Sequence, residues 1–193
     1  MTEIVDEFTT QVPKWTPHLE PIDLENATAL QLEALEVTPS NTKISDYVLV
    51  LAHDPESLIH RNPLFNTIMY GGPGGLSRAD RELGAIGASE FNKCIYCTAV
   101  HASRYIDLTT QTEVIDEIFE QESNADLPSR EQSIFDYSIA LSETPSTAST
   151  SELNALEIEN LNDLEILDLT LSVAIFCWAN RLMETLGQPV KKS

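Results

Sequence analysis

The sequence has few basic residues and few cysteines. Its 193 residues include 11 Lys and Arg against 31 Asp and Glu, which gives a formal net charge of −20 at pH 7. A field of this sign repels phosphate backbones and anionic membranes, so we expect neither a nucleic acid nor a membrane as partner. Three cysteines are too few for a disulfide scaffold, and a chain of this length can bury a substantial core without one.

Recognisable targeting and membrane-spanning segments are also missing. The first residues, MTEIVDEFTT, contain neither the positive nor the apolar region of a secretory signal. The longest uncharged apolar stretch with a helical pattern, Leu169 to Asn180, is well short of the ~20 residues that span a bilayer. We therefore expect a soluble, cytoplasmic protein.

Helical patterns follow one another along most of the chain, whereas no strand pattern of convincing length and no internal repeat is visible. A loose N-terminal arm (residues 1–23) is expected to precede a single helical domain (residues 24–193), so the predicted fold class is all-α. The helical patterns cover residues 24–37, 44–52, the stretches after Pro55 and after Ser77, and residues 112–119, 129–141 and 164–186. The β-branched content of residues 44–52 leaves a strand open there.

Several residues typical of helix ends support these boundaries. Pro55 suits the first position of a helix, and Ser77 followed by Asp80 resembles a capping box. Asn162 is a candidate cap of the last long helix, which Gly187 would end. The apolar residues of that helix occur nearly all round it, so we expect burial on more than one side, in the domain centre or against another subunit.

Two stretches are expected as connections. Residues 71–75, GGPGG, are interpreted as a turn, because the G-K-[ST] of a phosphate loop does not follow. Residues 144–151, TPSTASTS, are interpreted as a polar loop inside the domain, since the helices on both sides still need burial.

The segment ELGAIGASEFNKCIYCTAVH, from Glu82 to His101, joins an acid, two thiols and an imidazole in the pattern E-x11-C-x2-C-x3-H. Cys94 and Cys97 are one helical turn apart, and His101 follows one turn later on the same face. A thiol in the first turn of a helix lies near the positive end of the macrodipole, which favours the thiolate. Both cysteines are therefore candidate nucleophiles of a thiol redox site. In a reducing cytosol such a pair is more often catalytic than structural.

Glu82 reaches this site only if the chain bends. On one unbroken helix it would lie about 18 Å from Cys94 along the axis. Asn92 and Lys93 are plausible bending residues, so the pattern predicts two helices that meet at an angle. Glu90 lies on a similar stripe, and spacing alone does not choose between the two acids. The flanking cations Arg78, Arg81 and Lys93 are expected to make the site less negative and to favour the thiolate.

A zinc site is the structural alternative for the cysteine pair. A structural zinc site needs four ligands, and the only other cysteine, Cys177, lies in an apolar helical segment. Cys177 is more simply a small buried apolar residue.

The stretch LSRADRELGAIGASEFNKCIYCTAVH resembles the signature of the AhpD-like superfamily, which contains alkylhydroperoxidase D and the carboxymuconolactone decarboxylases, and within it the peroxidase-related branch. Weaker similarity continues through residues 53–75 and 179–181. The resemblance implies an AhpD-like helical bundle, commonly a homo-oligomer. We expect neither a cofactor nor a metal.

The same resemblance implies roles for four residues. Cys97 would attack the peroxide, Cys94 would resolve the sulfenic acid into a disulfide, and His101 with Glu82 would form a proton relay. This selects Glu82 over Glu90. Alkylhydroperoxidase D itself has a histidine where this chain has Tyr96, so part of the relay is expected to differ. The decarboxylases of the superfamily lack the cysteine pair, which argues against that reaction.

The resulting expectation is a thiol-dependent peroxidase or disulfide oxidoreductase. Its partners would be a hydroperoxide substrate and an unidentified thiol or dithiol reductant. Two alternatives stay open: a lyase or other small-organic-acid enzyme of the carboxymuconolactone decarboxylase type, and a non-catalytic redox or metal-binding protein.

Overall fold

The structure, a computed structural model, describes residues 3–38, 43–71 and 75–192. Within them the chain is mostly helical, which confirms the all-α fold class. The elements are, in chain order, β1 (Lys14–Pro17), η1 (Leu24–Asn26), α1 (Ala29–Ala34), α2 (Asp46–Leu51), α3 (Pro55–Tyr70), α4 (Arg78–Phe91), α5 (Ile95–Thr109), α6 (Thr112–Gln121), η3 (Glu122–Asn124), α7 (Ser129–Ser142), α8 (Thr150–Ile158), α9 (Asp163–Leu186) and β2 (Gly187–Val190).

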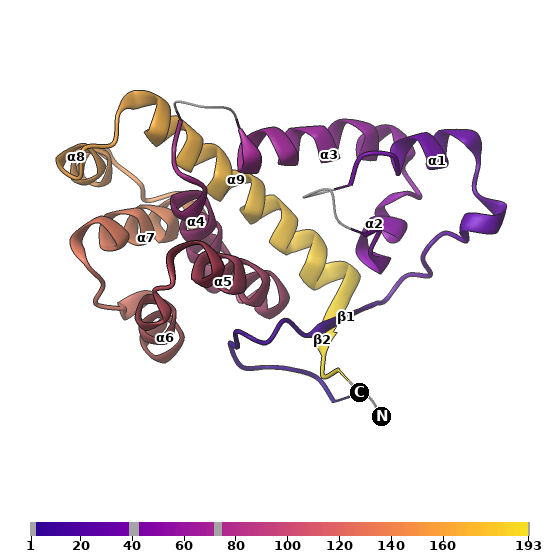
Figure 1. Cartoon of the computed structure of the whole chain (residues 1–193), viewed down its shortest axis with the longest axis horizontal. Coiled ribbons are helices and arrows are strands. Elements are labelled where there is room, and N and C mark those ends of the chain that lie inside the picture. Colours follow the sequence, from indigo (N-terminus) through magenta and orange to yellow (C-terminus); the bar gives the residue numbers. More distant parts are fainter. Residues whose placement is uncertain (1–2, 39–42, 72–74, 193) are drawn as a thin grey trace.

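The long helix α9 lies between two groups of helices. Figure 1 shows α9 crossing the molecule obliquely, with α4 to α8 on one side and α1 to α3 on the other. Helix α4 packs against α5, α7 and α9, and every residue from Arg81 to Glu90 is buried. The helix that opens the sequence motif is therefore enclosed by protein on all sides.

Side-chain caps set where the main helices begin. Ser77 accepts a hydrogen bond from the backbone N–H of Asp80 at the start of α4. Asn162 forms a full capping box with Glu165 at the start of α9, and Pro55 occupies the first turn of α3. These three starts, and the end of α9 before Gly187, agree with the sequence.

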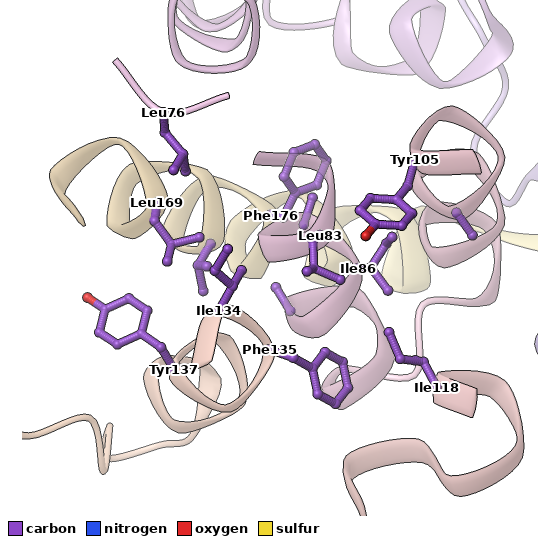
Figure 2. Packing of buried hydrophobic residues seen from close by; sticks show 14 of the residues in the cluster. Leu76, Leu83, Ile86, Tyr105, Ile118, Ile134, Phe135, Tyr137, Leu169 and Phe176 are labelled. Atoms are coloured by element: carbon purple, nitrogen blue, oxygen red, sulfur yellow. The ribbon is translucent and has the colours of Figure 1, made fainter. Parts of the chain in front are cut away.

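The buried apolar side chains form two clusters. The main cluster fills the space between α4, α5, α6, α7 and α9, and Figure 2 shows Leu83 and Ile86 of α4 there with Phe135, Leu169 and Phe176. The second cluster contains both cysteines of the motif together with apolar residues from the N-terminal half and α9, among them Trp15, Tyr47, Leu58 and Met183. Helix α9 contributes to both clusters.

Helix α4 carries glycine where two other helices approach it closely. A Cβ at Gly87 would lie 2.7 Å from the Cβ of Ser138 on α7, and one at Gly84 would lie 2.6 Å from a terminal methyl of Leu169 on α9. Heavy atoms at such distances overlap, so a side chain at either position forces a shift. The small residues keep α4 against its neighbours.

The segment expected as a loose arm is tied to the C-terminus. Strand β1 pairs antiparallel with β2, from Lys14 opposite Val190 to Pro17 opposite Gly187. Trp15 is buried, and its indole N–H donates to the carbonyl of Met183 (3.2 Å). The sequence pattern does not reveal these strands, because each has four residues and β2 reads Gly-Gln-Pro-Val, a composition that is depleted in strands.

Other boundaries depart from the sequence analysis for local reasons. The helical pattern of residues 24–37 divides into η1 and α1, because Thr28 caps a new helix through a box with Gln31. Helix α8 was not expected, and it begins inside the predicted loop 144–151 after a capping box of Ser149 and Glu152. Residues 44–52 contain the helix α2 and no strand. The turn expected at 71–75 falls on residues 72–74, which lie outside the described ones.

By length and composition alone, α9 could cross a membrane, which the sequence analysis did not expect from its shorter uncharged run. The helix has 24 residues and a mean hydropathy of 1.4 over its most apolar window, of which 44% is buried inside the protein. One such helix is weak evidence, since the core helix of a soluble protein has the same properties. Helix α9 contributes buried residues to both clusters, as expected of burial on more than one side. Leu167, Leu171 and Trp178 are exposed in the single chain, and burial of this face against another subunit stays a prediction.

The two glycines of α4 provide a matched test of packing. Gly87→Ala is expected to lower the free energy of unfolding by about 1–3 kcal/mol, because the Cβ of Ser138 is fixed to its backbone and cannot move aside. Gly84→Ala should cost less, since the end of the Leu169 side chain can rotate away and alanine favours the helix by up to about 1 kcal/mol. Urea unfolding of both variants measures the difference, and equal losses would contradict this account.

Candidate active site

The chain bends between α4 and α5 at the residues that the sequence indicated. Helix α4 ends at Phe91, Asn92 is its C-cap, and its side-chain amide donates to the carbonyl of Ala88 (2.7 Å). Lys93 has a φ of 57°, in the left-handed region. The backbone N–H of Cys94 then donates to the carbonyl of Ser89 (2.9 Å), so α5 begins folded back against α4.

Both cysteines of the pair are buried free thiols at the start of α5. Cys94 is the N-cap residue and Cys97 lies in the first turn, where the helix dipole favours negative charge. Burial raises the pKa of Cys94 well above its ordinary range, and the neighbouring Cys97 and the charge of Glu184 raise it further. Cys94 therefore keeps its proton.

The carboxylate of Glu82 joins two partners on different helices. One oxygen, Oε1, accepts from Nε of Arg78 (2.7 Å) and from a second nitrogen of the same guanidinium. The other, Oε2, is hydrogen-bonded to Nδ1 of His101. Glu82 is fully buried and His101 is 3% exposed, so the two carboxylate oxygens and the imidazole are shielded from water.

The electrostatics of this group define which atom carries the proton. Burial alone would raise the pKa of Glu82, but His101 and Arg78 outweigh it and lower that pKa, so the carboxylate stays ionised. Burial, together with the positive charges of Arg104 and Arg78, lowers the pKa of His101 despite the opposing effect of Glu82, which leaves the imidazole neutral. An ionised carboxylate only accepts hydrogen bonds, so the proton lies on Nδ1 and Nε2 is a free base.

The structure places the second acid, Glu90, in a different environment. Glu90 is also fully buried, but its oxygens accept from Lys93 (2.8 Å) and from the hydroxyl of Ser123 (3.1 Å). Glu82 is thus the acid that the fold brings to His101.

The flanking cations do not act as the sequence analysis expected. Arg78 is paired with Glu82, Arg81 with Asp168 (2.6 Å), and Lys93 with two glutamates. Each positive charge is offset by a nearby carboxylate, because this acidic chain supplies a partner close to each. None of the three lines the cavity next to Cys97.

That cavity has a volume of about 180 Å³ and lies between the N-terminal helices, α5 and α9. Cys97, Tyr96 and His101 of α5 line it, facing aromatic and apolar side chains that include Phe65 and Phe176. The His101 ring packs edge-on against Phe176, with centroids 4.1 Å apart. The cavity thus brings a thiol and a free imidazole nitrogen to one small space.

Two further charged residues near the cysteines were missed by the sequence analysis. Arg61 of α3 lines the cavity, and Glu184 in the last turn of α9 is hydrogen-bonded to Cys94. They lie far from the motif in sequence, and their residue types carry no spacing signal. Only the fold brings them to the site.

The third cysteine lies apart from this pair. Cys177 is partly buried, its thiol donates to Ser142 (3.2 Å), and it accepts from the side-chain amide of Asn92 (3.8 Å). Among the described residues, no three His, Cys, Asp or Glu side chains gather in a way that could hold a metal ion.

Comparison with known proteins finds a family match that covers the motif and solved structures with a similar fold. Residues 55–135 match the carboxymuconolactone decarboxylase family. An uncharacterised peroxidase-related protein with an alkylhydroperoxidase AhpD core, from Ralstonia eutropha JMP134, is 21% identical; the match covers 91% of this chain and 93% of that one, with a TM-score of 0.75. A peroxidase-related protein from Silicibacter sp. TM1040 is also 21% identical, over 89% and 92% of the two chains, with a TM-score of 0.70.

The debrominase Bmp8 in its apo form has a similar fold. It is 14% identical, the match covers 95% of this chain and 93% of that one, and the TM-score is 0.69. At these identities the likeness establishes the fold alone. No curated protein matches the sequence.

The raised pKa of Cys94 leads to a direct test. In the Cys97→Ser/Cys177→Ser variant, Cys94 is the only thiol, and its burial remains. We expect the ultraviolet absorbance of its thiolate to appear only above the ordinary thiol pKa of about 8.5. The same variant in denaturant should titrate near that ordinary value.

The raised pKa of Cys94 also makes the stability of the fold depend on pH. Because folding raises this pKa, Cys94 contributes stability that is fully present below about pH 8.5 and is lost as the pH rises through the folded-state pKa. Coincident titrations of the folded and denatured variant would contradict the assignment.

Proposed function

We propose that this chain, whose residues 55–135 match the carboxymuconolactone decarboxylase family, is a thiol-dependent peroxidase that reduces hydroperoxides. One observation carries the proposal: a buried Cys97 lines a cavity beside a neutral His101 that Glu82 orients, with the protonated thiol of Cys94 one turn away. These are a nucleophile, a base with its orienting acid, and a second thiol.

In the first step, Nε2 of His101 takes the proton of the Cys97 thiol. The thiolate then attacks the terminal oxygen of the hydroperoxide; an S–O bond forms and the O–O bond breaks. The departing alkoxide receives the proton from His101 and leaves as an alcohol. Cys97 is oxidised to a sulfenic acid, and the peroxide is reduced by two electrons.

In the second step, Cys94 attacks the sulfur of the sulfenic acid, and a disulfide forms as the S–O bond breaks. The carboxylate of Glu184, which is hydrogen-bonded to Cys94, accepts the proton of the Cys94 thiol. That proton then passes to the departing hydroxyl, which leaves as water. An external thiol or dithiol then reduces the disulfide and is itself oxidised, which restores both thiols.

Tyr96 replaces the histidine that alkylhydroperoxidase D has at this position. The Tyr96 side chain lines the cavity, and burial raises the pKa of its hydroxyl. It therefore stays protonated and serves as a hydrogen-bond donor rather than as a base. His101 is therefore the only general base in the proposed relay.

Different roles for the two thiols predict different products. Cys97→Ser should abolish peroxide consumption, whereas Cys94→Ser should consume one equivalent and stop at a trappable sulfenic acid. Glu184→Gln should form the sulfenic acid at the wild-type rate but close the disulfide more slowly. Mass spectrometry after mild oxidation with hydrogen peroxide or an organic hydroperoxide measures each product. Cys177→Ser is the matched control and should behave as wild type.

Three results would redirect the proposal. Loss of the first step in Cys94→Ser alone would reverse the two roles. A wild-type protein that spares hydroperoxides but converts a small organic acid would favour the lyase alternative. Stoichiometric zinc that survives dialysis would favour a metal-binding protein.

The proton relay predicts a second pattern. Glu82→Gln and His101→Asn should each slow the oxidation of Cys97 by roughly 10²-fold, the usual scale for a general acid–base group. Their combined effect should be far less than the product of the two, since they act as one unit. Stopped-flow measurement of the single-turnover rate tests this.

Glu90→Gln is the matched control, because it removes a buried carboxylate from the same helix without touching His101. It should leave the rate of Cys97 oxidation unchanged. If Glu90→Gln greatly slowed the oxidation of Cys97 while Glu82→Gln left its rate unchanged, the assignment of Glu82 as the carboxylate of the relay would be wrong.

A further inference from the structure

The cavity beside Cys97 has the opposite charge to the chain as a whole. Lys43, Arg61 and Arg104 line it together with His101, and none of the lining residues that the structure describes is acidic. In a chain of net charge −20, a cavity with three cations and no acid is exceptional. The electrostatic potential in the cavity is therefore expected to favour a negatively charged ligand.

Arg61 is the buried member of this group. It is 7% exposed, and its guanidinium donates to the Asn62 side chain (2.9 Å) and to the hydroxyl of Tyr47 (3.4 Å). Its Nε is buried and has no hydrogen-bond partner. Burial lowers the pKa of Arg61, as expected of a cation that lacks a close counter-charge.

Aromatic rings surround this guanidinium without neutralising it. It lies 4.1 Å from the ring centroid of Phe65 and 5.7 Å from that of Trp178. Cation–π contacts of this kind offset only part of the cost of burying an unpaired charge. Among the described residues, no carboxylate forms an ion pair with Arg61, in contrast to Arg78, Arg81 and Arg130.

Cys97 does not supply this missing counter-charge. Its electrostatic interaction with Arg61 is the smallest of those that act on the guanidinium. It also disappears once Cys97 is oxidised. Arg61 therefore lines the cavity without a carboxylate partner, and its charge is available to an anion that binds there.

We infer that the cavity binds a small amphipathic anion, a carboxylate carried on an aromatic or branched apolar body. The carboxylate pairs with Arg61, since a guanidinium matches a carboxylate in charge and geometry. The apolar body packs against Phe65, Met69 and Phe176, which line the same space. The exposed Lys43 and the half-buried Arg104 extend the positive charge outward.

The size of the cavity limits the ligand. A cavity of about 150 Å³ holds one benzene molecule, so the ~180 Å³ here fits one ring with a substituent, and a longer chain would reach solvent. This inference rests on the proposed function where it names the substrate: an organic hydroperoxide that bears a carboxylate, held by Arg61 with its O–O bond toward Cys97.

Binding is tested with benzoate and its neutral isostere benzamide on the reduced wild-type protein by titration calorimetry. We expect benzoate to bind at least tenfold more tightly than benzamide. Arg61→Met should remove this preference, and Arg61→Lys should retain part of it. Arg181→Met, which removes an exposed arginine outside the cavity, should leave it unchanged. Equal affinities in wild type, or a preference that persists in Arg61→Met, would overturn the inference.

A second measurement needs only the wild-type protein, so it tests the site even if Arg61→Met does not fold. On wild type, benzoate should slow the alkylation of Cys97 by iodoacetamide at concentrations where benzamide has no effect. Equal protection by the two compounds, or none by benzoate, would count against an anion site.

The substrate assignment has its own readout. Cumene hydroperoxide with a ring carboxylate should oxidise Cys97 at least tenfold faster than cumene hydroperoxide itself, and Arg61→Met should abolish the difference. Benzoate binding without any peroxide reduction would refute the proposed function but leave the site. Peroxide reduction with no preference for the anion would refute the site and leave the function.

Discussion

One buried carboxylate organises the chemistry of this protein. Glu82 has no access to water, so its charge is tolerable only because Arg78 and His101 both bind it. Removing Arg78 would leave an uncompensated charge inside the protein, and removing His101 would leave one carboxylate oxygen without its hydrogen-bond donor. The ionised carboxylate also fixes the imidazole tautomer, because it can only accept a hydrogen bond from Nδ1 of His101. The other ring nitrogen is therefore left free to accept a proton, and His101 lines the same cavity as Cys97.

That carboxylate stays in place because α4 cannot move. Gly84 and Gly87 let α9 and α7 approach it closely, and Ser172 of α9 donates to the carbonyl of Arg81 (2.9 Å). Arg81 in turn is paired with Asp168 of α9. Packing and polar contacts therefore hold the helix that carries Glu82 against the helix that closes the cavity. A rigid support of this kind is what a positioned acid–base pair requires.

Local features of this chain could be predicted from sequence, and distant ones could not. The cap at Ser77, the bend at Lys93 and the helical fold class follow from residues a few positions apart, whose preferences are intrinsic. Trp15, Arg61 and Glu184 reach the cysteines only through tertiary packing, and their residue types give no periodic signal. The expected role of the flanking cations was wrong for a related reason: sequence shows a charge but not its partner.

Long-range and local electrostatics act in opposite directions here, and their ranges differ. The net negative field is screened within a Debye length of about 8 Å at physiological salt, so it acts mainly on large or multiply charged molecules outside the protein. Inside the cavity screening is weak, and the unpaired Arg61 sets the sign. We therefore expect polyanions and anionic surfaces to be repelled before contact, whereas a small monoanion would lose little on approach and gain a buried counter-charge. The acidic surface and the cationic cavity together act as a filter on the size and charge of the ligand.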